Sequence, residues 1–123
     1  YTGLYLTPGT FESSAFDGIT SSAFNRFSAT ISQPAATTVK MQVAAAPAVS
    51  GSCTGASYAF VGPLGVSTDY FTSQGASISG TIPAGVYGGY DNPNQCFRYK
   101  VFMDTTDTNQ TPVFNDVTVN YSP

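Results

Sequence analysis

Apolar and polar residues alternate along several short segments of this chain, as they do in β-strands with one buried face. The clearest segment is 37–44, in which Val39, Met41 and Val43 fall on one side of the strand and polar residues on the other. Segment 24–32 places its apolar residues on one face in the same way; they are Phe27, Ala29 and Ile31. Both segments predict half-buried strands.

Glycine and proline interrupt the sequence often enough to leave no room for a long helix. Further strands are expected where aromatic and β-branched residues gather, at 10–16, 58–61, 67–71, 76–82, 96–104 and 112–122. The turn dipeptide Asp17-Gly18 would end the first of these strands. Residues 83–95 are rich in Gly, Pro and Asn, so we expect a long loop there.

The spacing of these segments predicts an all-β fold with about eight or nine strands, arranged as a two-sheet antiparallel β-sandwich of the jelly-roll kind. We expect the first and last strands to lie in the same sheet. No internal repeat, charge run or linker divides the sequence, so residues 1–123 are expected to form one domain.

The composition argues against several classes of function. Only 9% of the residues are charged, and the absence of histidine removes the commonest general base and transition-metal ligand. The seven carboxylates show no recognisable catalytic spacing, so we expect no enzyme activity, no catalytic residues and no cofactor. Four scattered basic residues argue against a nucleic-acid partner. No apolar run approaches the ~18 residues that a membrane span needs.

The two cysteines, Cys53 and Cys96, together with few Lys and Glu residues, suggest a secreted, extracellular protein whose signal peptide has been removed. A disulfide between them would close a loop of about 42 residues and contribute about 4 kcal/mol in the chain-entropy description. The alternative is two independent buried thiols.

Residues of the 83–95 segment supply a candidate sugar-binding site, because flat aromatic faces and polar side chains are what carbohydrate sites use. These residues are Tyr87, Tyr90, Asp91 and Asn92. Loops of this composition also simply connect strands in any sandwich, and tryptophan, the usual sugar-stacking residue, is absent.

The oxygen-rich stretch that contains Asp104 and Asp107 is a weak candidate for Ca²⁺. It lacks the glycine and the closing glutamate of an EF-hand loop, and side-chain hydrogen bonds that shape a turn explain it more simply. No other metal site is expected.

Arg98 and Lys100 alternate with apolar residues, so both cations are expected on one face of a strand. They would either pair with carboxylates of a neighbouring strand, such as Asp116, or form a subunit contact.

Five segments, taken together, resemble the β-sandwich head domains at the carboxy-terminal end of bacterial type IV pilin-like proteins. They are 9–17, 38–44, 58–63, 97–102 and 111–123. The likeness spans nearly the whole chain. Related sandwich modules also occur as appendages on secreted and sugar-binding proteins.

Type IV pilins begin with a long apolar helix, whereas this sequence opens with Tyr1 followed by Gly, Pro and strand-like residues. The resemblance therefore implies the globular chain of a split pilin, which polymerises together with a short helical chain. It implies a structural subunit of an extracellular pilus or pseudopilus. The residues expected to contact the helix are Tyr1, Leu4, Tyr5 and Leu6. The alternative function is a secreted carbohydrate-binding β-sandwich module.

Overall fold

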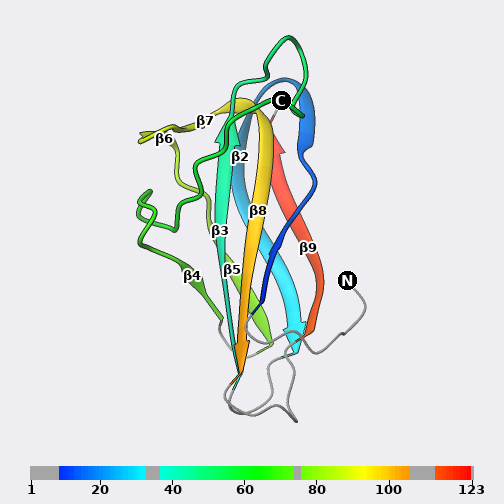
Figure 1. The fold of residues 1–123 in the computed structure, drawn as a ribbon, viewed down its shortest axis with the longest axis vertical. Helices are drawn as coiled ribbons and strands as arrows, with labels where there is room; N and C mark the ends of the chain where they lie inside the picture. Colours follow the sequence, from blue (N-terminus) through cyan, green and yellow to red (C-terminus); the bar gives the residue numbers. More distant parts are fainter. Residues whose placement is uncertain (1–8, 33–36, 74–75, 106–112, 123) are drawn as a thin grey trace.

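The computed structural model describes residues 9–32, 37–73, 76–105 and 113–122, which contain nine strands and no helix (Figure 1). The strands are β1 (Gly9–Glu12), β2 (Phe16–Ser32), β3 (Thr37–Ala46), β4 (Phe71–Thr72), β5 (Ser77–Thr81), β6 (Gly85–Tyr87), β7 (Tyr90–Asn92), β8 (Asn94–Thr105) and β9 (Val113–Ser122). The described residues contain no helix that is long and apolar enough to cross a membrane.

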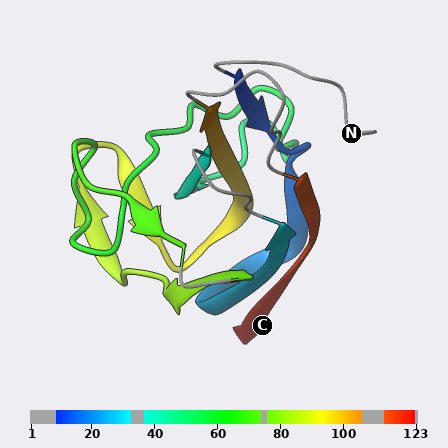
Figure 2. The same cartoon turned by 90° about the horizontal axis from the view of Figure 1, so that it is seen from below.

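Seven of the strands form one antiparallel sheet in the order β4-β3-β8-β2-β5, with β1 added to β8 and β9 added to β2. Strands β6 and β7 form a separate hairpin. The large sheet curls, so that β3 and β8 face the second half of β2 and its neighbours β5 and β9 (Figure 2). The prediction of an all-β, sandwich-like fold is confirmed. The first and last strands were expected in the same sheet, but β1 belongs to the β8 layer and β9 to the layer that faces it, and only the continuity of β2 connects the two.

Strand β2 belongs to both layers. Its first residues pair with β8, and the part that follows Ser22 pairs with β5 and β9. The register shifts between Asp17 and Ser22, where Ile19 has a left-handed φ of 72°. The prediction that Asp17-Gly18 ends a strand was therefore wrong. The irregularity bends β2 from one layer to the other, as bulges do, without ending the strand.

The core lies between the two layers. The predicted apolar faces of 24–32 and 37–44 are confirmed, since all six of their apolar side chains are at most 2% exposed. Phe27 meets the edge of the Phe71 ring with centroids 4.7 Å apart, which joins β2 to β4 across the core. The alternation of polar and apolar positions thus identified the two strands that supply half of the buried core cluster.

The outer face of β3 is partly covered by the segment that leads to β4. Gln42 was expected to point outward, yet it is only 5% exposed. Its side-chain Nε2 donates hydrogen bonds to the carbonyl oxygens of Ser67 and Asp69, both at 2.8 Å. The strand predicted at 58–61 is reduced to a single bridge between Val43 and Val61. The strand predicted at 67–71 is reduced to β4.

The segment 83–95 is not the long loop that its composition predicted, because it holds the β6–β7 hairpin and the start of β8. The Asn92 side chain, 2% exposed, fastens this hairpin to β2. Its Oδ1 accepts a hydrogen bond from the Phe24 N–H at 3.0 Å, and its Nδ2 donates to the Phe24 carbonyl at 2.9 Å. Nδ2 also donates to the Pro83 carbonyl at 2.8 Å. One amide group therefore pairs with the backbone as a neighbouring strand would.

Cys53 and Cys96 form a disulfide, as one of the two sequence readings predicted. The bond ties the segment between β3 and β4 to the beginning of β8. That segment has little strand pairing of its own, so the covalent link fixes its path over the sheet.

Replacement of Asn92 by alanine is expected to lower the free energy of unfolding by about 2–4 kcal/mol, because it leaves buried backbone groups of Phe24 without partners. The matched control is Asn25→Ala, since the Asn25 side chain donates only one exposed hydrogen bond, to Ser122 Oγ at 3.1 Å. The control should change the free energy by no more than about 0.5 kcal/mol. Denaturant unfolding of both variants measures the difference, and equal losses would contradict this role of Asn92.

Candidate docking surfaces

A groove opens where the curled sheet does not close on itself. Among the described residues, β1 pairs only with β8 and β9 only with β2, so the facing edges of β1 and β9 are both unpaired (Figure 2). The space beside them has a volume of about 250 Å³. We call it the β1–β9 groove, and its lining residues are Ser13, Ser14, Phe16, Phe97, Tyr99, Val117, Val119 and Tyr121.

The β1–β9 groove is apolar apart from its two serines. Phe16 and Tyr121 stand at its rim with ring centroids 5.1 Å apart, and they are 41% and 42% exposed. Phe24 lies beneath them and packs against Phe97 with centroids 4.7 Å apart. Burial raises the pKa of the Tyr99 phenol above its ordinary value. The groove thus offers hydrophobic contact without a charged side chain in its lining.

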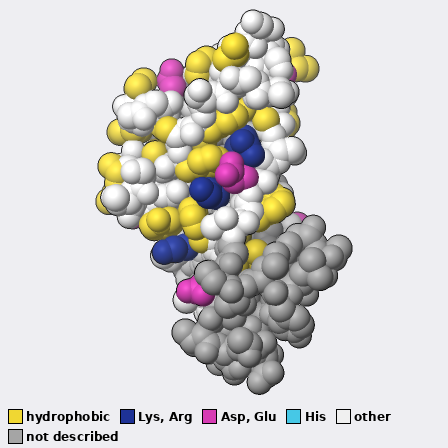
Figure 3. Space-filling model, viewed as in Figure 1, with side chains coloured by type: hydrophobic (Ala, Val, Ile, Leu, Met, Phe, Trp, Pro, Cys, Tyr) yellow, Lys and Arg dark blue, Asp and Glu magenta, His cyan; other side chains and the backbone are white. Residues whose placement is uncertain are grey.

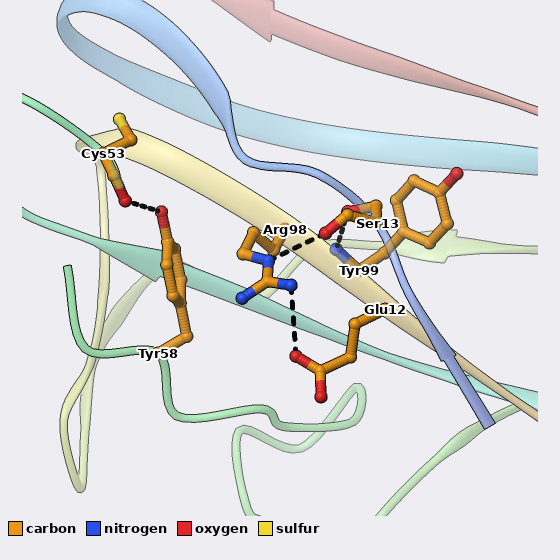
Figure 4. A network of polar contacts seen from close by, with 6 residues as sticks. All are labelled: Glu12, Ser13, Cys53, Tyr58, Arg98 and Tyr99. Atoms are coloured by element: carbon orange, nitrogen blue, oxygen red, sulfur yellow. Dashed lines mark hydrogen bonds and ion pairs between the residues drawn. The ribbon is translucent and has the colours of Figure 1, made fainter. Parts of the chain in front are cut away.

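Ser13 holds the β1 side of the groove against β8 (Figure 4). Its N–H donates to the Tyr99 carbonyl at 2.9 Å, and its Oγ accepts the Tyr99 N–H at 3.0 Å. Its carbonyl accepts a hydrogen bond from Arg98 Nε at 2.8 Å. The backbone next to the groove is therefore fixed on its inner side.

Arg98 connects this corner to the disulfide. Its guanidinium forms an ion pair with Glu12 at 3.2 Å and lies over the Tyr58 ring at 5.1 Å. The Tyr58 hydroxyl donates to the Cys53 carbonyl at 3.0 Å. The partner of Arg98 is thus Glu12 of β1 and not Asp116, which lies on β9 opposite Thr30. The prediction that Arg98 pairs with a carboxylate of a neighbouring strand is confirmed, but the example Asp116 was wrong because β1, not β9, lies beside β8.

The other cations on the same face also lie over aromatic rings. Lys40 Nζ is 4.1 Å from the centre of the Tyr70 ring. Lys100 Nζ is 5.3 Å from the centre of the Phe102 ring and 5.6 Å from the centre of the Phe60 ring. Figure 3 shows the basic side chains of this face apart from one another among apolar and neutral ones, with acidic side chains beside them. Because each cation already contacts a ring within the chain, this face is not an open stripe of positive charge.

A second apolar surface lies on the opposite side of the molecule from β9, at β6 and the segment before β4 (Figures 1 and 2). Its exposed side chains are Leu64, Val66, Val86 and Tyr87, which are 76%, 47%, 72% and 40% exposed. Val66 and Tyr87 line a hollow of about 420 Å³, whose other lining residues are Ala59, Phe60, Val61, Gly65, Ser67 and Gly88. The Tyr87 ring packs directly on Gly65, where a Cβ atom would come within 2.9 Å of the ring. We call this surface the β6 hollow.

The four residues of the candidate sugar site do not share one surface. Tyr90 and Asn92 are 0% and 2% exposed and belong to the core, so neither can stack on or bind a ligand from solvent. The Tyr90 hydroxyl donates to the Pro83 carbonyl at 2.6 Å, and burial strongly raises the pKa of this phenol. Tyr87 reaches the surface, and Asp91 is half-buried.

The remaining predicted sites are only partly covered by the described residues. Asp104 is exposed near the end of β8, whereas Asp107 lies outside the described residues. In the part of the chain that is described, no three metal-binding side chains come together. The expected helix contacts Tyr1, Leu4, Tyr5 and Leu6 also lie outside the described residues.

Comparison with protein-family models, with curated proteins and with solved structures finds no match to this chain. The resemblance to pilin head domains therefore stays a prediction from the sequence. The two docking surfaces were not predicted. The alternation of Val117, Val119 and Tyr121 marks one wall of the β1–β9 groove, but the open edge beside it depends on strand pairing.

Replacement of Arg98 by lysine is expected to lower the free energy of unfolding by about 1–2 kcal/mol, because lysine lacks the Nε–H that binds the Ser13 carbonyl and the planar group that covers Tyr58. Glu12→Gln is the matched variant on the other side of the ion pair. It should cost less than about 1 kcal/mol, since this pair is partly solvated. Denaturant unfolding at low and high salt distinguishes the two variants. The loss of unfolding free energy in Glu12→Gln should shrink at high salt, whereas the loss in Arg98→Lys should not. A larger loss in Glu12→Gln than in Arg98→Lys would contradict this account.

Proposed function

We propose that this chain is a non-catalytic structural subunit of an extracellular filament, a type IV pilus or pseudopilus, in which it forms the globular part and docks on a short helical pilin chain. The observation that carries the proposal is the presence of two different apolar surfaces on opposite sides of one lightly charged domain.

Two different contact surfaces are what an open assembly requires. A subunit that binds its neighbour through one surface and is bound through another forms a filament whenever the rotation between copies does not close a ring. The β1–β9 groove side and the β6 hollow are unlike in shape and residues, so they suit such a head-to-tail contact. With 9% charged residues and 14% aromatic residues, the chain also has the composition that favours interface cores.

Ile19 supports a contact at the exposed bend of β2. It is 81% exposed and has a φ of 72°, a conformation that β-branched residues rarely adopt. Strain of this kind costs about 1–3 kcal/mol and is concentrated at functional positions. An exposed isoleucine held in a strained conformation three residues after Phe16 is readily explained by a partner that covers it.

The proposal also includes an extracellular location and a helical partner chain. The Cys53–Cys96 disulfide is compatible with an oxidising, extracellular location. The helical partner is inferred from the sequence resemblance, and its contact is assigned to Tyr1, Leu4, Tyr5 and Leu6. We expect a short, strongly apolar helical chain to co-purify with this protein from its source cells.

Two surface variants test the filament. Leu64→Asp changes the exposed apolar surface next to the β6 hollow and Ile19→Gly changes the exposed bend of β2, and each should reduce surface filaments at least tenfold when counted by electron microscopy. Ile19→Gly should do so without loss of stability, because glycine adopts the left-handed φ freely. The control is Thr118→Asp, a change at an exposed position on β9 that should leave filament number and melting temperature unchanged. Purified chain that assembles alone into native-like filaments would contradict the two-chain arrangement.

The exposure of Tyr87 beside a hollow favours carbohydrate binding as the second candidate function. A glycan panel, screened with and without Ca²⁺, would then give binding that Tyr87→Ala abolishes. Tyr90→Ala is not an informative variant, since Tyr90 lies in the core. Binding that Tyr87→Ala leaves unchanged, or no binding at all, would exclude the hollow as a sugar site.

A further inference from the structure

The outer edge of β9 lacks the features that usually keep a strand edge from pairing with another chain. Such edges are commonly blocked by charged side chains, by proline or by bulges. Residues 117–121 are Val-Thr-Val-Asn-Tyr, with no charge and no proline, and their register with β2 is unbroken from Val117 to Asn120. Among the described residues, β9 pairs only with β2. Its other edge therefore suits a strand of a partner.

The β1–β9 groove beside this edge accepts the side chains of an added strand. Val117, Val119 and Tyr121 line the groove, whereas Thr118 and Asn120, which alternate with them, are exposed. A strand paired with β9 would place every second side chain in the groove. Since no charged side chain lines the groove, the side chains that enter it have to be apolar. A helix of about 10 Å diameter could not approach the edge at the ~4.8 Å spacing of paired strands.

Strand β6 has a matching edge on the other side of the molecule. It consists of Gly85, Val86 and Tyr87, and among the described residues it pairs only with β7. The Val86 side chain is 72% exposed, so it packs in no core of its own copy. The β6–β7 hairpin projects on the side away from β9 and cannot reach the groove of its own copy (Figures 1 and 2).

Two buried side chains hold the β6–β7 hairpin in position. The Asn92 amide binds both backbone groups of Phe24, and the Tyr90 hydroxyl donates to the Pro83 carbonyl at 2.6 Å. A two-stranded hairpin alone is only marginally stable in water, so these bonds fix β6 before any partner arrives. A pre-organised strand loses less conformational entropy when it binds.

We propose that β6 of one copy pairs with the outer edge of β9 in the next copy, with Val86 in the β1–β9 groove beside Val119. This contact rests on the proposed filament function and specifies its head-to-tail interface. One kind of contact, repeated from copy to copy, then joins the two surfaces of the domain. Thr118 stays on the solvent-facing side of β9.

Disulfide cross-linking in filaments tests the contact. The two native cysteines are bonded to each other, so each introduced cysteine is the only free thiol of its chain. Cells that produce Val86→Cys and Val119→Cys chains together supply the filaments. After mild oxidation, mass spectrometry should find dimers linked through positions 86 and 119. Their yield should be about tenfold above that from Val86→Cys with Thr118→Cys, because position 118 faces away from the groove.

Each other outcome of the cross-linking contradicts the contact. Equal yields from the two pairs of variants, or filaments without mixed dimers, would overturn it and leave the filament function standing. Dimers linked only through position 119 of both copies would show that β9 pairs with β9 instead. If wild-type cells carry no filaments that contain this chain, both the contact and the filament function are wrong.

An exchange of charges gives a second measurement that needs no cross-link. Val86→Asp and Val119→Lys should each reduce surface filaments about tenfold, because each places an unpaired charge in an apolar contact. The two changes in one chain should restore filaments, since the contact then pairs Asp with Lys. Thr118→Asp is again the control without effect. Melting temperatures of the isolated chains identify any variant that fails to fold, and folded double-variant chains that restore no filaments would contradict the contact.

Discussion

The bend of β2 between Asp17 and Ser22 is the constraint on which the rest of the structure depends. It carries one continuous strand from the β8 layer to the β9 layer, so the two layers must face each other. The Asp17 carboxylate holds the bend by accepting the Gln95 side chain at 2.8 Å and the Ile19 N–H at 2.7 Å, and these bonds lower the pKa of Asp17. A side chain at Gly18 would collide with Ser22 Oγ, which explains the glycine.

The sequence was sufficient for features that depend on local periodicity. The buried faces of β2 and β3 follow from an alternation that each strand carries in its own residues, and the fold class follows from the number of such strands. The sequence was insufficient where a residue far along the chain decides whether a side chain is buried. Asn92 and Gln42 look like polar loop or surface residues, and only the approach of Phe24 and Asp69 turns them into buried hydrogen-bonding groups.

The docking surfaces also depend on contacts between distant parts of the chain. Phe16 and Tyr121 could equally have filled the core, as Phe27 and Phe71 do. Phe16 and Tyr121 are left at a rim because no described strand pairs with the outer edges of β1 and β9. Edge pairing is set by the path of the whole chain, so no short pattern reveals which apolar residues will remain exposed.

The pairing of β9 also has a mechanical consequence. It lies along β2 from the Ser32–Val113 pair to the Ala23–Ser122 pair, and both strands follow the long axis of the molecule (Figure 1). A pull on β9 along that axis would load the hydrogen bonds of the ladder together, in shear, instead of opening them one after another. A domain built in this way resists stretching along its length far better than peeling from one end.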